Sequence, residues 1–451
     1  MNAELETPLV NQEPEVKPEI DLARIDLNAL WVVRRLHAKG YEAYLTGGCV
    51  RDLLLGKEPK DFDVATSAKP EEIQKIFRNC RLIGRRFLLA HIFFPGGKII
   101  ETATFRANPT DVQEDMPEDL LVTQDNVYGN LEEDAKRRDL TINGLFYDPI
   151  AGKVIDYVGG RADLETRTVR TIGEPDIRFQ EDPVRILRAI KFASRLDFQI
   201  EENSLAAMSR HAEGITRCAP ARVQEEIVRL LTSGFSEKAF GLCHTLGILN
   251  VLMPELVEAL NQDLEVGPSW ASKEGVKESL SSEHRYNHLK ALLKALDETI
   301  ARDANVPTCV AFSVLLLPAY LALEKSTQNE RHWIDKLCVA WAERIRLTRH
   351  DQDRLRLLLS AIFIFSPEKL EKKSAQYMVR KSWFKEALLL YILDLVARGQ
   401  SLESVGVWKA LAEEAGKPYR QDRRGAPRPR VAFNRRRPNN RRWKQRGRPA
   451  S

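Results

Sequence analysis

The sequence predicts an α+β head domain, followed by an all-helical neck and body and a disordered basic tail. In residues 41 to about 149, short apolar runs are separated by glycine pairs, which is typical of strands joined by turns and helices. From about residue 181 to 415, apolar residues recur almost throughout with helical spacing. Residues 416–451 contain no run that could form a core.

Composition and charge narrow the class of protein. The 451 residues are 43% hydrophobic, which excludes wholesale disorder and suits about three structural units. The net charge is only +5, yet residues 417–451 hold fourteen Lys or Arg and a single acid, Asp422. An acidic body with a basic tail indicates a polyanionic partner. Charge alone leaves RNA, a membrane surface and an acidic protein open as that partner.

The expected domain boundaries follow these changes of texture. We expect a disordered leader over 1–20, a head over 21–160, a neck over 161–260, a helical body over 261–415 and a tail over 416–451. Residues 26–39 have the periodicity of the head's first helix, and 108–126 suggest a flexible loop. Residues 1–20 lack a signal-peptide pattern, no apolar stretch is long enough for an integral membrane segment, and the six cysteines form no CxxC pair. A cytoplasmic location is the simplest expectation.

A strand that ends in two glycines opens the first candidate site. Thr46-Gly47-Gly48 leads from the apolar run at Leu45 directly into a predicted helix. Backbone N–H groups at such a helix start can face a phosphate, and the Arg51 guanidinium would add a charged donor.

Two aspartates follow on the next predicted strand. Because strand side chains alternate, Asp61 and Asp63 project to one face while Phe62 points into the core. Two carboxylates placed in this way repel each other unless a cation lies between them, and their oxygens suit Mg²⁺. The pattern therefore predicts a metal site.

The order of these motifs carries a resemblance to a known family. Residues 47–56 followed by Asp61-Phe62-Asp63 resemble the signature of the polymerase-beta-like nucleotidyltransferases, in the class II branch of bacterial poly(A) polymerases and CCA-adding enzymes. Residues 137–143 (RRDLTIN) resemble the branch's second motif, 156–160 (DYVGG) its hinge, and 181–185 (EDPVR) its base-reading element. Residues 82–92 and the basic tail are similar to the features that set bacterial poly(A) polymerases apart from CCA-adding relatives.

The resemblance implies a reaction and a set of roles. An RNA 3′-OH would attack the α-phosphate of ATP and release pyrophosphate, with two Mg²⁺ ions held by Asp61 and Asp63. Asp139 is the preferred third carboxylate, and Glu101 stays open as the alternative. The nucleotide would be bound by the residues Gly47, Gly48, Arg51, Arg138, Asp182, Arg185 and Arg188.

Three neck arginines, two of them from that set, share a predicted helix face. Arg185, Arg188 and Arg195 recur at spacings of three and seven, so we expect them to contact nucleotide or RNA. In the tail, Phe433 and Trp443 lie among arginine clusters and would stack on unpaired bases while the arginines bind phosphate.

The resemblance implies an enzyme that synthesises poly(A) and thereby promotes RNA processing and decay. The expected partners are RNA 3′ ends and RNA-decay proteins, and the expected state is a monomer. A CCA-adding tRNA nucleotidyltransferase and a non-catalytic RNA-binding adaptor remain as alternatives. The adaptor would be expected to lack an active-site acid, whereas Asp61, Asp63 and Asp139 are all present.

Overall fold

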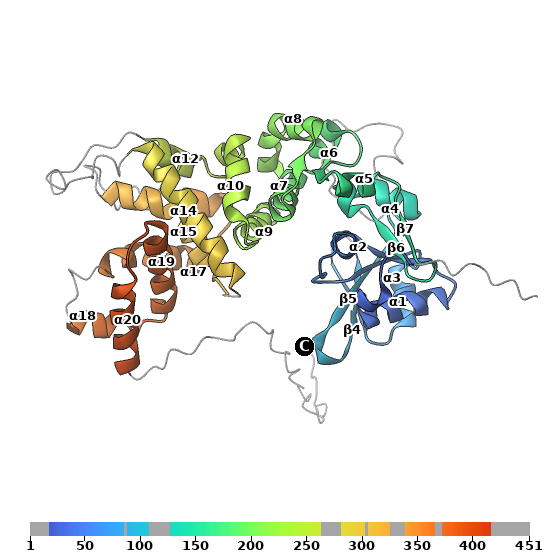
Figure 1. Cartoon of the computed structure of the whole chain (residues 1–451), viewed down its shortest axis with the longest axis horizontal. Helices are drawn as coiled ribbons and strands as arrows, with labels where there is room; N and C mark the ends of the chain where they lie inside the picture. Colours follow the sequence, from blue (N-terminus) through green and yellow to red (C-terminus); the bar gives the residue numbers. More distant parts are fainter. Residues whose placement is uncertain are drawn as a thin grey trace, which may run out of the picture.

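The computed structural model describes residues 18–84, 88–107, 127–262, 281–302, 305–324, 339–365 and 372–415. These residues follow one another along an arch (Figure 1), with the sheet-containing head at one end and α18 to α20 at the other. Helices α5 to α10 lie between them. The predicted α+β head is thereby confirmed, and the remainder is mostly helical, with one short two-stranded sheet in the predicted neck that the all-helical expectation missed. The 416–451 tail and the 108–126 loop lie outside the described residues.

A mixed seven-stranded sheet organises the head. Its strand order is β3-β4-β5-β2-β1-β6-β7, and β2 pairs parallel with β5 while the other neighbours are antiparallel. The strands are β1 (Ala43–Thr46), β2 (Asp63–Thr66), β3 (Cys80–Ile83), β4 (Leu89–Phe93), β5 (Ile99–Thr104), β6 (Phe146–Asp148) and β7 (Lys153–Ile155).

The two faces of this sheet are covered differently. One face packs against α1 (Leu27–His37) and α3 (Pro70–Ile76), where Val64, Ile92 and Ile100 are buried in the main core. On the opposite face, a smaller cluster joins Ala65 to residues around α4 (Leu131–Arg137). Strand alternation therefore places Asp63, two residues before Ala65, on the second face.

The start of the described chain is packed against the head. Tyr147 donates its hydroxyl proton to the carbonyl of Ile20, and Glu19 N–H donates to Gly152 O at 3.0 Å. Residues 18–20, which were expected to belong to a disordered leader, are therefore held on the β6–β7 turn. The expected helix at 26–39 is α1, which begins after the Asp26 cap.

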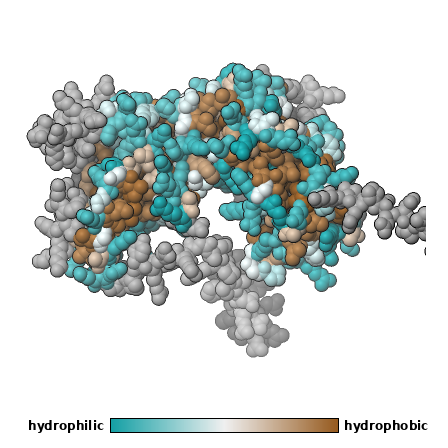
Figure 2. Space-filling model, in the orientation of Figure 1, coloured by the Kyte–Doolittle hydropathy of each residue, from teal (hydrophilic) through white to brown (hydrophobic). Residues whose placement is uncertain are grey.

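Helices make up most of the chain after the head. The neck elements are α5 (Gly160–Glu165), α6 (Pro175–Glu181), α7 (Val184–Leu196), α8 (Glu202–Arg210), α9 (Pro220–Leu231) and α10 (Ser236–Thr245), with the short strands β8 (Thr168–Val169) and β9 (Gln199–Ile200). The neck ends with α11 (Ile248–Leu252) and α12 (Pro254–Asn261), and the body contains α14 (Ser282–Ala301), α15 (Thr308–Glu324), α17 (Arg349–Ala361), α18 (Lys372–Met378), α19 (Phe384–Ala397) and α20 (Glu403–Glu414). Figure 2 shows hydrophobic residues gathered over the body helices and over the head, each within a hydrophilic rim.

The apolar helix α15 forms the centre of the body. Its Val314, Leu315, Leu316 and Leu317 are fully buried, and it packs against α14, α17 and α19. Across the described segments, we find no helix whose length and hydropathy would let it cross a bilayer.

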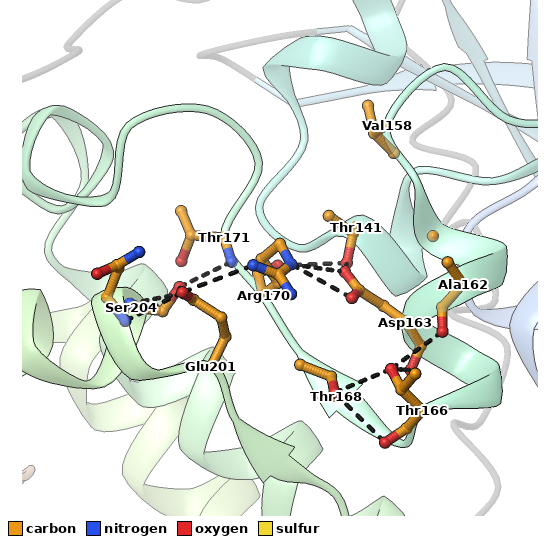
Figure 3. A network of polar contacts seen from close by, with 12 residues as sticks. Thr141, Val158, Ala162, Asp163, Thr166, Thr168, Arg170, Thr171, Glu201 and Ser204 are labelled. Atoms are coloured by element: carbon orange, nitrogen blue, oxygen red, sulfur yellow. Dashed lines mark hydrogen bonds and ion pairs between the residues drawn. The ribbon is translucent and has the colours of Figure 1, made fainter.

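A network of polar contacts joins the head to the neck (Figure 3). Thr141, in the segment that follows Asp139, donates a hydrogen bond to Asp163 of α5 at 2.6 Å. The Arg170 guanidinium also binds Asp163, and it lies 3.5 Å from Glu201 at the start of α8. Backbone bonds run in parallel, since Thr141 N–H donates to Arg170 O and Ile172 N–H donates to Asp139 O. The neck is therefore hydrogen-bonded to the same loop that carries Asp139.

Candidate active site

The glycine turn after β1 has the predicted backbone geometry. Gly47 has φ +71°, a value that favours glycine, and it is the N-cap of α2 (Gly48–Leu54). Its own N–H donates to Leu145 O at 3.1 Å, so this donor is already used. A phosphate at this turn would therefore meet the N–H groups from Gly48 onward. The guanidinium of Arg138 lies 3.4 Å from the position of a Cβ at Gly47, which places that cation beside the turn.

Arg51 lies beside the turn, with its Nη2 3.6 Å from the position of a Cβ at Gly48, but it is buried and already bound to other side chains. It is 2% exposed, it binds the neighbouring Asp52, and its Nη1 donates to Asn143 Oδ1 at 2.6 Å. Its guanidinium also lies 4.8 Å from the ring centroid of Phe192 on α7. Through these contacts Arg51 links α2 to the loop that carries Asn143 and to α7 of the neck, and so stabilises the turn.

Asp63 has a carboxylate neighbour that comes from the parallel strand. In the β2–β5 register Asp63 lies directly opposite Glu101. Burial together with the negative charges of Glu101 and Asp61 raises the pKa of Asp63 to about 6, against a smaller opposing effect of Arg138. Phe62 is buried in the core, as the alternation predicted. Three acids thus gather where β2 begins.

Asp139 is paired with a cation. Arg188 of α7 donates from Nε to Asp139 Oδ2 at 2.6 Å, while Leu140 N–H and Asn143 Nδ2 donate to Oδ1. Although burial opposes the charge, Arg188 and these hydrogen bonds hold the pKa of the Asp139 carboxyl well below its usual range. Both oxygens of Asp139 therefore already have partners, whereas the exposed Glu101 faces Asp63 directly.

Arg138, which was expected to fix the ribose, lies near both the Gly47 turn and Asp63. Arg138 binds Asp134 Oδ2 through Nε and Nη2, and its Nη1 is 3.4 Å from Asn143 O. Its guanidinium packs over the ring of Phe146 at 4.8 Å. These contacts hold a positive charge close enough to Asp63 to affect its pKa.

The base-reading element is held by further charged residues. Arg222 of α9 binds Asp182 through two donors, at 3.1 and 2.8 Å. Arg185 binds Glu181 at 3.2 Å, and Glu181 also binds Arg178 at 2.6 Å. Because these contacts fix their side chains, Asp182 and Arg185 are presented in one orientation.

The same element is also fastened to the ribose motif. The Nη2 of Arg178 donates to the backbone carbonyls of Arg137 and Arg138 at 2.6 and 2.8 Å. Arg178 itself is 6% exposed. One buried guanidinium therefore connects the loop before Asp139 to the residues expected to read the base.

The predicted arginine face of α7 packs against the head. Arg188 binds Asp139, the Phe192 ring contacts Arg51, and Arg195 is 3.4 Å from Asp52. These three positions recur at spacings of four and three, so one helix face carries them all. In the structure this face connects the neck to the head. The Nη1 of Arg188 also lies 3.9 Å from Oε1 of Glu226 on α9, a second ion pair.

The acids at β2 have the chemistry of a site for divalent metal. Carboxylate oxygens are the ligands that Mg²⁺ prefers, and the mutual repulsion that raises the pKa of Asp63 is what a cation would relieve. Among the described residues, no three His, Cys, Asp or Glu side chains already enclose a metal position. The fit to a divalent cation thus rests on the chemistry of the carboxylates near Asp63, since Glu101 lies opposite it and the charge of Asp61 raises its pKa.

Two regions of the chain match known protein families. Residues 43–170 match the model of the poly A polymerase head domain, and residues 197–260 match a model described as the probable RNA and SrmB-binding site of polymerase A. Both matched regions are therefore similar to parts of polymerase A.

The curated relatives that the chain matches include poly(A) polymerases I and CCA-adding enzymes. The poly(A) polymerase I of Haemophilus influenzae is 48% identical over 234 residues, which are 51% of this chain and 52% of that protein. The poly(A) polymerase I of Escherichia coli O6:H1 is 43% identical over 261 residues, 57% of this chain and 56% of that protein. A CCA-adding enzyme of Levilactobacillus brevis is 42% identical over 205 residues, 45% of this chain and 49% of that protein. The chain thus spans about half the length of the curated relatives it matches.

Solved structures of CCA-adding enzymes show the same fold. The Bacillus stearothermophilus CCA-adding enzyme in complex with CTP aligns with a TM-score of 0.59 at 24% identity, over 86% of this chain and 80% of that one. The Thermotoga maritima CCA-adding enzyme complexed with tRNA aligns with a TM-score of 0.55 at 20% identity, over 87% and 84% of the two chains. The polymerase-beta-like head and its helical extension, expected from the motifs, agree with these neighbours.

Several site residues were not singled out by sequence reasoning. Asn143, which bridges Arg51 and Asp139, belongs to the RRDLTIN motif but was not assigned a role. Arg178, Arg222 and Glu226 hold α7 and the residues expected to read the base. Arg222 and Glu226 lie on α9, which carries no sequence motif, and Arg178 lies just before the EDPVR motif. Only the i to i+3 pair of Arg178 and Glu181 carried a local signal.

Proposed function

We propose that this protein is a template-independent polynucleotide adenylyltransferase, which adds AMP from ATP to RNA 3′ ends, releases pyrophosphate and so promotes RNA processing and decay. The observation that carries the proposal is the gathering of Asp61, Asp63 and Glu101 beside the Gly47 turn. The chain's similarity to poly(A) polymerase I sequences at 43–48% identity supports AMP as the unit added.

We assign the metal to the acids of β2 and β5. Asp61 and Asp63 would hold Mg²⁺, with Glu101 as the third carboxylate because it lies opposite Asp63 and Asp139 is committed to Arg188. When bound, two such ions lower the pKa of an attacking hydroxyl and neutralise a triphosphate. Asp139 then has a different role, which is to hold Arg188 and Asn143 at the junction of head and neck.

We place ATP on the β1 side of these acids. Gly48 and the following N–H groups of the turn would face the triphosphate, and Arg138 would lie beside the ribose. Asp182 and Arg185 would bind the base edge, with Arg222 and Glu181 holding them in place. Selection of ATP would then reside in these side chains, with no nucleic-acid template.

RNA is the proposed second substrate and partner. Residues 197–260, which match the RNA and SrmB-binding model, would contact RNA along the neck, and they are the proposed region for an RNA-decay protein. The basic tail would add salt-dependent affinity for RNA. The proposed location is the cytoplasm and the proposed state is a monomer.

A primer-extension assay tests the function. Short RNA, Mg²⁺ and each of the four NTPs are supplied separately, with the Asp63→Asn variant as control. A long ladder with ATP, little extension with CTP and none from the variant are expected. Full activity in the variant would refute the metal assignment.

The second candidate function is CCA addition, which the alignments to CCA-adding structures favour at the level of fold. On a trimmed tRNA, extension that stops after C, C and A would establish it. No extension with any nucleotide would favour the non-catalytic adaptor.

A further inference from the structure

A ladder of side chains leads away from the proposed metal ligands across four strands. Asp63 lies opposite Glu101, Glu101 lies opposite His91, and His91 lies opposite Arg81 in the strand registers. Residues that are directly paired on adjacent strands project to the same face. The catalytic face of the sheet therefore continues from β2 through β5 and β4 to the edge strand β3.

The part of this face on β3, β4 and β5 is basic and apolar. The Arg81 guanidinium lies 5.5 Å from the Phe93 ring centroid, and the His91 and Phe93 rings are 6.4 Å apart. We call this surface the open strip; its members are Arg81, Ile83, His91, Phe93 and Ile99.

The side chains of the open strip are accessible to solvent, while the opposite face of the same strands is buried. Ile83 and Ile99 are 46% and 40% exposed, which is unusual for isoleucines beside a catalytic centre. The alternating residues Ala90, Ile92 and Ile100 are buried against the helices on the other face. The strands thus present a rigid surface whose inner side is fixed by the core.

The position of the open strip follows from the in-line geometry of the proposed reaction. The groups assigned to ATP all lie on the β1 side of Asp63, at the Gly47 turn and on the neck. Attacking and leaving oxygens approach a transferred phosphorus from opposite sides. The attacking 3′-OH must then come from the β5 side, where the open strip begins at Glu101.

We propose that the open strip seats the last nucleotides of the RNA primer, an inference that rests on the proposed function. Phe93 stacks on a base, Arg81 binds a backbone phosphate, and the exposed isoleucines contact the flat faces of neighbouring bases. His91, whose Nε2 is 3.4 Å from Glu101 Oε1, lies where the strip meets the proposed metal ligands. Stacking on an aromatic ring tolerates any base, which suits an enzyme that accepts RNA ends of varied sequence.

Kinetics of variants provide the first test in the full-length protein. Phe93→Ala and Arg81→Ala should each raise the KM for a short single-stranded primer about tenfold, since a stacked base or paired phosphate is lost. The KM for ATP should stay unchanged. Phe93→Leu, which keeps apolar volume in the strip, controls for folding. Arg35→Ala is matched in charge, because Arg35 lies on α1 against Trp31 and Phe77 on the covered side. An unchanged primer KM in both strip variants would overturn the proposal.

Crosslinking separates the strip from the proposed function. RNA carrying 4-thiouridine next to its 3′ end should crosslink to the β4 strand, Leu89–Phe93, while the same label placed far upstream should not. This readout needs no catalysis, so it remains decisive if the wild-type protein adds no nucleotide. Terminal crosslinks confined to other segments would overturn the proposal even in an active enzyme.

Discussion

Arg188 of the neck donates from Nε to Asp139 Oδ2 of the head at 2.6 Å. The two residues are far apart in the chain, and the contact joins the motif segment of the head to the helix that follows the base-reading element. Asp139 also receives hydrogen bonds from Leu140 N–H and Asn143. Their pairing makes the head–neck junction part of the candidate active site.

Removal of this ion pair should destabilise the protein. Arg188→Ala leaves the buried Asp139 carboxylate without its cation, at a cost of about 3 kcal/mol in the free energy of unfolding. Arg195→Ala, on the same helix face, should cost less than about 1 kcal/mol because Arg195 is more exposed and is 3.4 Å from its partner Asp52. Urea unfolding of both variants measures the difference, and equal losses would contradict the assigned importance of the Arg188 contact.

The same pair predicts a pH dependence. Arg188 holds the pKa of Asp139 below that of an unfolded aspartate, about 4, so its stabilisation is complete above that pH and is lost as the pH falls through the acid range. The difference in unfolding free energy between wild type and Arg188→Ala should therefore shrink on acidification below about pH 4. Chemical denaturation at several acid pH values tests this, and a constant difference would refute it.

Asp63 should act in the opposite direction in metal-free protein. Its pKa of about 6 lies above the unfolded value, so the native state binds the proton more tightly and stability is lost as the pH rises through 6. Near neutral pH the ionised Asp63 costs roughly 3 kcal/mol in the free energy of unfolding. Asp63→Asn should therefore raise the melting temperature in EDTA at pH 7.5 while abolishing nucleotide addition. Mg²⁺ should stabilise wild type more than the variant; a variant that melts lower in EDTA would contradict the electrostatic explanation.

Arg222 should affect nucleotide choice more than turnover. Its two hydrogen bonds hold Asp182, so Arg222→Ala frees the proposed base-reading carboxylate to move. We expect the ratio of kcat/KM for ATP over CTP to fall about tenfold, equivalent to about 1.4 kcal/mol of discrimination. Arg229→Ala is a control on the same helix, since Arg229 binds Glu225 and Glu226. An unaltered ATP preference in Arg222→Ala would show that Asp182 needs no such support.

The Thr141–Asp163 hydrogen bond should contribute both to the stability of the head–neck junction and to the rate of nucleotide addition. Thr141→Val removes the hydrogen bond to Asp163 while keeping the side-chain shape, and we expect a loss of about 1–2 kcal/mol. Thr166→Val, which removes a bond to Ala162 O within α5, serves as a comparison. If the junction positions Asp139, kcat should fall in the first variant alone. Equal kcat values would restrict the network to a structural role.

Local sequence was sufficient for the elements that depend on near neighbours. The alternation around Asp61-Phe62-Asp63 predicted the shared face and the buried ring, and Phe62 is buried. The two glycines predicted a strand-to-helix turn, and Gly47 has the positive φ that such a turn needs. Gly160, in contrast, is required by a contact with a residue distant in the sequence. A Cβ there would lie 2.2 Å from the Thr141 carbonyl oxygen, so the hinge requires glycine for close packing.

The charged residues show where local reasoning stopped. Arg51 and Arg188 were both expected to face a nucleotide, yet one is buried beside Asn143 and the other binds Asp139. A guanidinium in a motif has the same sequence signal whether it binds phosphate or a carboxylate of its own protein. Which partner it finds depends on elements that fold against it from elsewhere in the chain.

From the sequence alone came the α+β head, the mostly helical remainder, the resemblance in motif order to poly(A) polymerases, and the burial of Phe62 between Asp61 and Asp63. These follow from periodicity and from residues a few positions apart. The tertiary structure decided the neighbour of Asp63, because the parallel register of β2 and β5 brings Glu101 across 38 positions of chain. It likewise decided that α7 holds the head through Arg188, Phe192 and Arg195, since those contacts exist only when two separately folded units meet.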